Sequence, residues 1–164
     1  MVTTTDRIVK RVFLRAPQER VWRAISESRR FGAWFGMQFD GEFVAGQPIT
    51  GTIAPTKVDP EVAKMQEKYA GKTFGFTIDR IEPMRLFSFR WHPHALDPNR
   101  DYSNEPTTLV EFVLEPKDGG TQLTIEESGF DGIPIDRRAD AFEANDGGWE
   151  AQATLIAKYL AMQT

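Results

Sequence analysis

The chain has 164 residues, of which 40% are hydrophobic and 27% are charged, with a formal net charge of −4 and no cysteine. This composition is typical of a globular domain with one sizeable core, and it argues against nucleic-acid or anionic-membrane binding. The absence of cysteine excludes disulfides, thiolate metal sites and cysteine nucleophiles, and no segment looks like a signal peptide or membrane span, so a cytoplasmic location is expected.

The N-terminal segment predicts a strand followed by two short helices. Residues 6–14 are rich in β-branched and aromatic side chains, which favours a strand. Pro17 suits the first turn of a helix, and a second helix over residues 28–36 is expected to end at Gly36. The buried stripe of the first helix is predicted to be Val21, Trp22 and Ile25.

Two strands and an inserted helix are expected next. The strands cover residues 37–43 and 48–55. Residues 57–71 contain a helix start at Asp59-Pro60 and a stop at Gly71. The apolar face of this inserted helix is predicted to carry Val62, Met65 and Tyr69.

Four further strands predict an antiparallel meander. They cover residues 72–83, 85–92, 107–116 and 120–128, and a long loop over residues 93–106 interrupts them. Alternation places three side chains of each of the first two strands on a single face, namely Phe74, Phe76 and Ile78, then Phe87, Phe89 and Trp91.

The last helix is expected to begin near Pro134 or Asp136 and to end near Met162. One stripe carries Phe142, Asn145, Trp149, Ile156 and Leu160. Gly147 and Gly148 weaken the helix, and we expect them either to allow close approach to a strand or to let the helix bend. Asn145 would then point into an apolar space; the alternative is that it faces solvent and the glycines only ease packing.

A curved sheet gripping one long helix should enclose a hollow. We predict a pocket of about 300–1,000 Å³, lined by Trp91 and Trp149, that binds an apolar or aromatic small molecule. The alternative for each aromatic residue is ordinary core packing. The candidate ligand-binding residues are Trp34, Phe74, Phe76, Phe89, Trp91, His92, Tyr102, Asn145 and Trp149, and Glu111 and Glu127 are further polar candidates.

Four segments together resemble one known family. "APQERVWRAISESRRFGAWF", "IDRIEPMRLFSFRW", "TTLVEFVLEPKDGGTQLTIEESGF" and "NDGGWEAQATLIAKYL" occur in the order found in the activator of heat-shock-protein-90 ATPase homologues. The resemblance covers nearly the whole chain. It implies an α+β, helix-grip fold of the START-like superfamily, in which a curved antiparallel sheet wraps around the long C-terminal helix, with residues 1–164 as a single domain.

The resemblance implies a ligand-binding protein without a cofactor, and two other functions stay open. One is a low-turnover cyclase or hydrolase in the same cavity, for which His92 with Glu127 is the pair to test. The other is a protein-interaction module like a co-chaperone, although the separate N-terminal domain of the eukaryotic co-chaperone is missing from this chain. Whether the chain forms a homodimer is also open.

Two further expectations concern metals and the pocket mouth. His92 and His94 could begin a metal site, but the sequence provides no recognisable third ligand, so we expect no bound metal. The inserted helix and the long loop, through Tyr102, are predicted to meet over the pocket as a lid. The alternative is that each decorates a different edge of the sheet.

Overall fold

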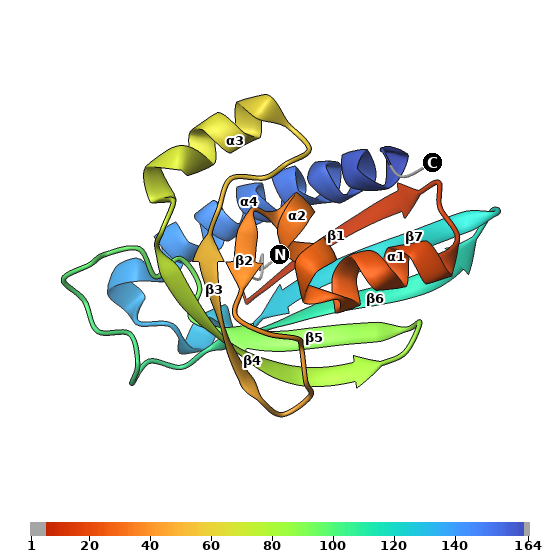
Figure 1. Ribbon diagram of the computed structural model, residues 1–164. Helices are drawn as coiled ribbons and strands as arrows, with labels where there is room; N and C mark the ends of the chain where they lie inside the picture. The colour runs from red at the N-terminus through yellow and green to blue at the C-terminus, as the bar shows by residue number, and fades with distance from the viewer. Residues whose placement is uncertain (1–5, 163–164) are drawn as a thin grey trace.

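The computed structural model describes residues 6–162, which form one antiparallel sheet of seven strands with a long helix along it (Figure 1). The strands lie in the order β1-β7-β6-β5-β4-β3-β2. The predicted α+β, helix-grip architecture is therefore confirmed. The strands are β1 Arg7–Leu14, β2 Met37–Phe39, β3 Pro48–Ile53, β4 Thr73–Glu82, β5 Leu86–Trp91, β6 Thr108–Lys117 and β7 Gly120–Ser128.

Helices connect the two edges of the sheet and cover its inner face. The helices α1 and α2 lead the chain from β1 to β2, α3 with the following 3-10 turn η1 is the inserted helix, and the 3-10 turn η2 precedes α4 (Figure 1). None of the helices within residues 6–162 is long and apolar enough to cross a bilayer. Their bounds are α1 Gln18–Ser26, α2 Ser28–Phe35, α3 Pro60–Gln66, η1 Glu67–Tyr69, η2 Phe130–Gly132 and α4 Ile135–Ala161.

Side-chain alternation in the β6–β7 hairpin decides which face of the sheet carries the core. Every second residue of each strand is buried, from Thr108 to Leu114 on β6 and from Thr121 to Glu127 on β7. Asp118 and Gly119 turn the chain with φ angles of 48° and 79°, as a two-residue hairpin requires. The register opposes Glu127 to Val110 and thus fixes a carboxyl group on the apolar inner face.

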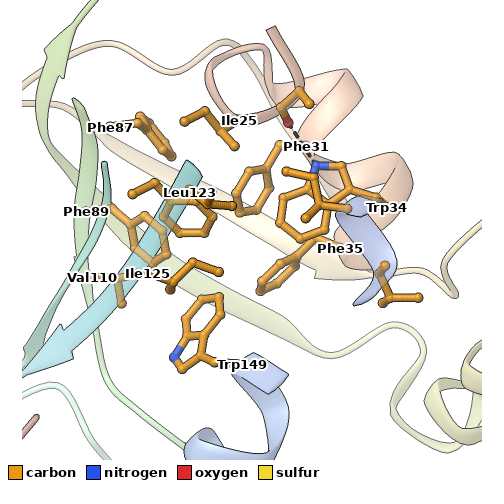
Figure 2. Packing of buried hydrophobic residues seen from close by; sticks show 14 of the residues in the cluster. Ile25, Phe31, Trp34, Phe35, Phe87, Phe89, Val110, Leu123, Ile125 and Trp149 are labelled. Carbon is orange, nitrogen blue, oxygen red and sulfur yellow. Dashed lines mark hydrogen bonds between the residues drawn. The ribbon is translucent and has the colours of Figure 1, made fainter. Parts of the chain in front are cut away.

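Aromatic rings fill the space between the sheet and the helices (Figure 2). Phe31 of α2 lies 4.8 Å from Phe35 and 5.8 Å from Phe112, measured between ring centroids, and all three side chains are buried. Packing at this density stabilises the fold through burial of apolar area and through edge and offset ring contacts.

The strand expected over residues 37–43 is shorter than predicted. It ends at Phe39, because Phe43 turns inward and packs 4.9 Å from both Phe39 and Phe87. The apolar residues of "MQFDGEF" therefore pack into the core both from the strand and from the loop that follows it.

The inserted helix is present, but its predicted face is wrong at one position. Met65 is 70% exposed, whereas Val62 and Tyr69 are half-buried. The inward stripe passes through Gln66 instead, whose side chain accepts a hydrogen bond from Thr56 N and donates one to the Phe35 carbonyl. Asp59 caps the helix and pairs with Lys158 of α4, which places α3 beside α4 (Figure 1).

The close approach of α4 to a strand that the two glycines predicted is wrong. A Cβ added to Gly147 or Gly148 meets no atom within 4 Å, and α4 continues through both as one helix. Neither glycine is needed for close approach to a strand, because both face open space.

We therefore expect Gly147→Ala and Gly148→Ala each to raise the free energy of unfolding, by about 0.5–1 kcal/mol, through lower backbone entropy of the unfolded chain. Urea denaturation measures the change. The matched control is Gly32→Ala, which should destabilise the protein because its Cβ would lie 2.0 Å from the Met37 carbonyl oxygen. A loss of stability in the α4 variants would contradict the prediction.

Candidate functional site

A pocket of about 200 Å³ opens where α4, α3 and one end of the sheet meet. It is smaller than the volume predicted from the sequence. Helix ends, strand ends and the start of the long loop all contribute side chains to it. The lining residues are Phe35, Gly36, Met37, Ile53, Gln66, Tyr69, Phe74, Trp91, His92, His94, Leu96, Asn145 and Gln152.

A second hollow, of about 610 Å³, lies at the other end of the sheet beside the β6–β7 turn. It is wide open, and Arg15, Lys117 and Asp118 of its border are charged. Small-molecule sites are enclosed and mostly apolar, so the smaller pocket fits that description better.

The wall of the pocket is aromatic and is backed by the core. Trp91 lies 6.4 Å from Phe35, 5.4 Å from Phe76 and 5.8 Å from Trp149, measured between ring centroids. Trp149 is 2% exposed and faces this cluster from α4 (Figure 2). The rings are held by neighbours on several elements, so the wall is preformed.

The structure brings only part of the predicted set into the pocket. Phe74, Trp91, His92 and Asn145 line it. Trp34, Phe76, Phe89 and Trp149 are buried core residues that do not line it. Their burial reflects the long-range packing of α2 and α4 on the sheet, and the ligand-binding role of all these residues remains a prediction.

Glu127 is the centre of a buried polar network. Its side chain is completely buried, and each carboxylate oxygen accepts two hydrogen bonds. Oε1 accepts from Trp149 Nε1 at 2.7 Å and from Asn145 Nδ2 at 2.9 Å. Oε2 accepts from Thr108 Oγ1 at 2.6 Å and from Trp91 Nε1 at 2.8 Å. A carboxylate has room for about four such bonds, so the group is saturated.

This network joins β5, β6, β7 and α4 at the back of the pocket. Trp91 and Asn145 have one side on the pocket and donate to Glu127 on the other. Glu127 therefore positions pocket residues without lining the pocket itself. The predicted pair of His92 with Glu127 does not form, because His92 Nε2 bonds the Glu105 carbonyl instead, at 3.0 Å.

Two polar lining residues were missed by sequence reasoning. Gln66 belongs to the inserted helix and Gln152 to α4, three residues beyond Trp149. Gln152 Nε2 donates to the Phe35 carbonyl at 3.1 Å, and its Oε1 is buried without a donor among the described residues. The spacing of Gln152 from Trp149 on one helix was the available signal, but glutamine is common on exposed helix faces.

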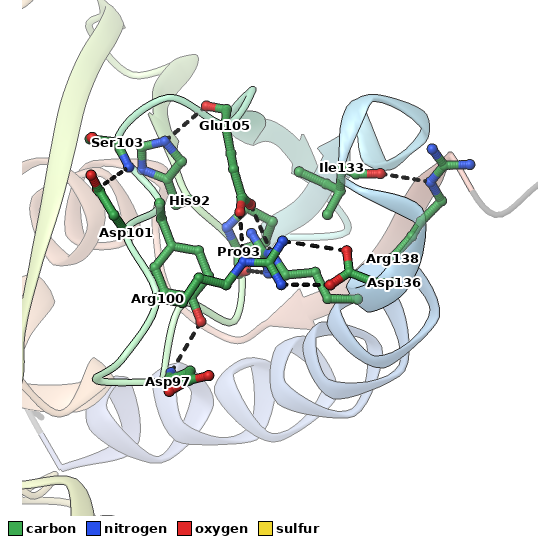
Figure 3. Close-up of polar contacts among 12 residues, drawn as sticks. His92, Pro93, Asp97, Arg100, Asp101, Ser103, Glu105, Ile133, Asp136 and Arg138 are labelled. Carbon is green, nitrogen blue, oxygen red and sulfur yellow. Dashed lines mark hydrogen bonds and ion pairs between the residues drawn. The ribbon is translucent and has the colours of Figure 1, made fainter.

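Ion pairs of Arg100 and Arg137 hold the long loop, and Figure 3 shows those of Arg100 with Glu105 and Asp136. Arg137 is 8% exposed, and it donates to Glu105 Oε1 at 2.8 Å and to the Pro93 carbonyl at 2.7 Å. Burial raises the pKa of Glu105, but hydrogen bonds from Arg137 and Arg100 outweigh that effect and hold the pKa below its usual value.

Tyr102 serves this loop rather than the pocket. Its hydroxyl accepts a hydrogen bond from Asp97 N at 3.1 Å, and the Arg137 guanidinium lies 4.7 Å from its ring centroid. Tyr102 does not line the pocket, so its predicted place at the pocket is not supported by the geometry. A cation over the ring face stabilises the loop instead.

The inserted helix and the long loop do meet at the pocket border. Gln66 and Tyr69 line it from one side, and His94 and Leu96 line it from the other. Lys72, just after the insertion, donates to the Leu96 carbonyl at 3.2 Å and links the two segments. Their action as a lid remains a prediction.

Metal ligands are not gathered at this site. Within residues 6–162, no three or more His, Asp or Glu side chains are arranged to hold a metal ion. His92 and His94 both line the pocket, but they lack a third ligand among the described residues.

Solved structures with the same fold come from several bacteria. Protein MLL2253 from Mesorhizobium loti is 22% identical, with a TM-score of 0.70, covering 96% of this chain and 98% of that one. A protein from Arthrobacter aurescens is 15% identical, with a TM-score of 0.72 and coverage of 98% and 90%. DynU16, a protein in the dynemicin biosynthetic locus, is 23% identical with a TM-score of 0.67. The match covers 97% of this chain and 48% of DynU16.

The TM-scores, at identities below 25%, show a common fold. No curated protein matches the sequence. The family, however, is shown directly, because residues 15–161 match the one described as Activator of Hsp90 ATPase homolog 1-like protein. The match spans most of the chain and confirms the resemblance read from the four sequence segments, so this chain belongs to the family of Activator of Hsp90 ATPase homolog 1-like proteins.

Proposed function

We propose that this protein binds an apolar or aromatic small molecule in the pocket between α4, α3 and the end of the sheet. The observation that carries the proposal is a preformed aromatic wall, in which Phe35, Phe74 and Trp91 face a space of about 200 Å³. Small-molecule sites are mostly apolar with a few fixed polar groups, and here Asn145 and Gln152 are such groups. The family's START-like fold supports a binding role.

Catalysis has less support than binding. Among the described residues, the lining includes no Asp, Glu, Lys or Arg, and the nearby Glu127 already accepts four hydrogen bonds. A general base must have a lone pair within reach of the substrate proton. Tyr69, His92 and His94 are the described lining groups that could move a proton, and His92 Nε2 is engaged by the Glu105 carbonyl.

A protein-interaction role also has less support. The large exposed apolar side chains, such as Phe13, Val44, Met65 and Ile135, belong to separate elements of the fold. A docking surface usually needs a contiguous apolar patch of a few hundred Å². Scattered single side chains are normal on a monomer.

Binding can be tested with toluene as a probe and with the indole N–H signals of the tryptophans as reporters. We expect toluene to shift the Trp91 signal and to leave that of Trp22, on α1, unchanged. Native mass spectrometry of freshly purified protein would show any ligand that copurifies.

A blocking variant and a control make the test specific. Leu96→Trp adds bulk at the pocket border and should abolish the toluene shift. Met65→Trp adds the same bulk at an exposed position that does not line the pocket and should leave it intact. Toluene binding that survives Leu96→Trp, or no binding to the unmodified protein, would refute the proposal.

A further inference from the structure

One wall of the pocket is formed by the α3 segment, residues 58–70, which is joined to the rest of the fold by few side chains. It consists of the seven-residue helix α3 and the turn η1, and none of residues 60–69, all of which the structure describes, is buried. Gln66 and Tyr69 are the residues that it contributes to the pocket lining. A helix of this length is marginal by itself, and segments with little buried area open most easily.

The two ends of the α3 segment are fixed to the fold. Before it, Thr56 is buried, and its hydroxyl donates to the Trp34 carbonyl at 2.8 Å. After it, Gly71 N donates to the Ile53 carbonyl at 2.9 Å, and Ile53 N donates to the Lys72 carbonyl at 2.8 Å. Movement is therefore confined to the residues between Thr56 and Gly71.

Gln66 holds the C-terminal end of α3 against α2. Its Oε1 accepts a hydrogen bond from Thr56 N at 2.7 Å, and its Nε2 donates to the Phe35 carbonyl at 3.3 Å. The amide also lies over Gly36, where an added Cβ would be 2.6 Å from Gln66 Nε2. The side chain thus closes the space between the two helices on the pocket side.

An ion pair holds the N-terminal end of α3. Asp59 Oδ2 accepts a hydrogen bond from Lys158 Nζ of α4 at 2.5 Å, and the Lys158 side chain is 48% exposed. Exposed ion pairs contribute little to stability. Val62 adds a half-buried contact with the core. This end of the helix is therefore held by weak contacts.

The opposite border of the pocket is held more firmly. His94 and Leu96 of the long loop form that border. The buried Arg137 side chain donates to the Pro93 carbonyl at 2.7 Å and pairs with Glu105 at 2.8 Å. Breaking a buried ion pair costs far more than breaking an exposed one, so the α3 side moves more easily than the loop side.

Building on the proposed function, we infer that the α3 segment is a movable wall that determines the size of the ligand. With α3 in place, the volume of about 200 Å³ suits a single ring, because an apolar cavity of about 150 Å³ accepts benzene. When α3 moves away, Gln66 and Tyr69 leave the lining and the pocket admits a two-ring molecule. The larger ligand binds only the open form, so its apparent affinity is reduced by the fraction of protein that is open.

Calorimetric titration with benzyl alcohol and diphenylmethanol tests the inference, because the two alcohols differ by one ring. Lys158→Met breaks the ion pair and leaves the lining unchanged, since Lys158 does not line the pocket. We expect diphenylmethanol to bind about threefold more tightly to this variant and benzyl alcohol to bind as before. Asp59→Asn removes the same ion pair and keeps a side chain that caps the helix, so it should have the same effect. The double variant should show no more than either single change.

Amide hydrogen exchange provides a measurement that does not depend on a ligand. The Thr56 amide is protected by Gln66, so its exchange and that of residues 61–70 should rise about threefold in Lys158→Met. Exchange in residues 93–106 should not change. The matched control is Lys10→Met, which breaks ion pairs with Asp146 and Glu150 of α4 and should alter neither measurement.

The outcomes separate this inference from the proposed function. Unchanged diphenylmethanol affinity and unchanged exchange in Lys158→Met and Asp59→Asn would overturn the inference and leave the binding of single rings intact. An equal gain for both alcohols would also overturn it, because such a gain involves no selection by size. No binding of any probe, toluene included, would overturn both the inference and the proposed function.

Discussion

Replacement of Glu127 with alanine is expected to lower the free energy of unfolding by about 3–5 kcal/mol. The substitution removes the acceptor of four donors at once, from Trp91, Thr108, Asn145 and Trp149. Hydrogen bonds to a charged group are among the stronger ones in proteins, and their donors would be left without this partner at a completely buried position. Urea denaturation followed by tryptophan fluorescence measures the loss.

Two further variants distinguish the effect of losing the hydrogen-bond network from the effect of losing a carboxylate alone. Glu127→Gln keeps the shape but brings an amide N–H toward the Trp91 or Trp149 N–H, so an intermediate loss of about 1–3 kcal/mol is expected. The neighbouring Glu126→Ala removes a half-buried carboxylate that pairs with Arg7 at 3.3 Å, and it should cost less than about 1 kcal/mol. Wild-type stability in Glu127→Ala would show that the network is not what holds α4 to the sheet.

Arg137→Ala is expected to lower the free energy of unfolding at neutral pH by about 2–3 kcal/mol, and to loosen residues 93–106. Arg137 donates to Glu105 and to the Pro93 carbonyl and lies over the Tyr102 ring. Urea denaturation gives the loss of stability, and amide hydrogen exchange reports on the loop. Arg138→Ala is the matched control, because within residues 6–162 Arg138 bonds the Ile133 carbonyl of its own chain segment and no other group.

Acid provides a second signature of the same contacts. The pKa of Glu105 is held below its ordinary value of 4.5 in the folded protein, and a hydrogen bond from Arg100 similarly lowers the pKa of Asp136. A carboxyl group whose pKa is lowered by folding stabilises the fold at every pH above its pKa in the unfolded chain. That stabilisation is lost as the pH falls through its pKa in the folded protein. The difference between wild type and Arg137→Ala should therefore shrink below about pH 4. A constant difference down to about pH 3 would contradict the assignment to Glu105.

Local patterns in the sequence determined the elements of the fold. The alternation in β4 to β7, the "KDGG" turn and the helical stripe of α4 predicted the meander and the closing helix, because period and turn chemistry act between near neighbours. The four segments resembling the family then predicted the helix-grip architecture. Boundaries were less certain, as in β2, where Phe43 left the strand to join the core.

The site was predictable only in part. Four of the residues that the sequence assigned to ligand binding, Phe74, Trp91, His92 and Asn145, line one pocket, and their role in binding stays a prediction. The sequence could not decide that Phe76 and Phe89 fill the core while Phe74 stays at the pocket. All three side chains occupy inward positions of two adjacent strands. The helices that pack over these strands determine which of the three side chains remains accessible.

Tertiary structure alone decided the chemistry of the pocket. Glu127 meets its partners across separations of 18 to 36 residues, so no local pattern shows that its carboxylate is saturated. The free acceptor of Gln152 depends on where the Phe35 carbonyl lies at the end of another helix. Sequence period determines which face of an element is apolar, but hydrogen-bond partners and pocket volume arise only when distant elements pack together.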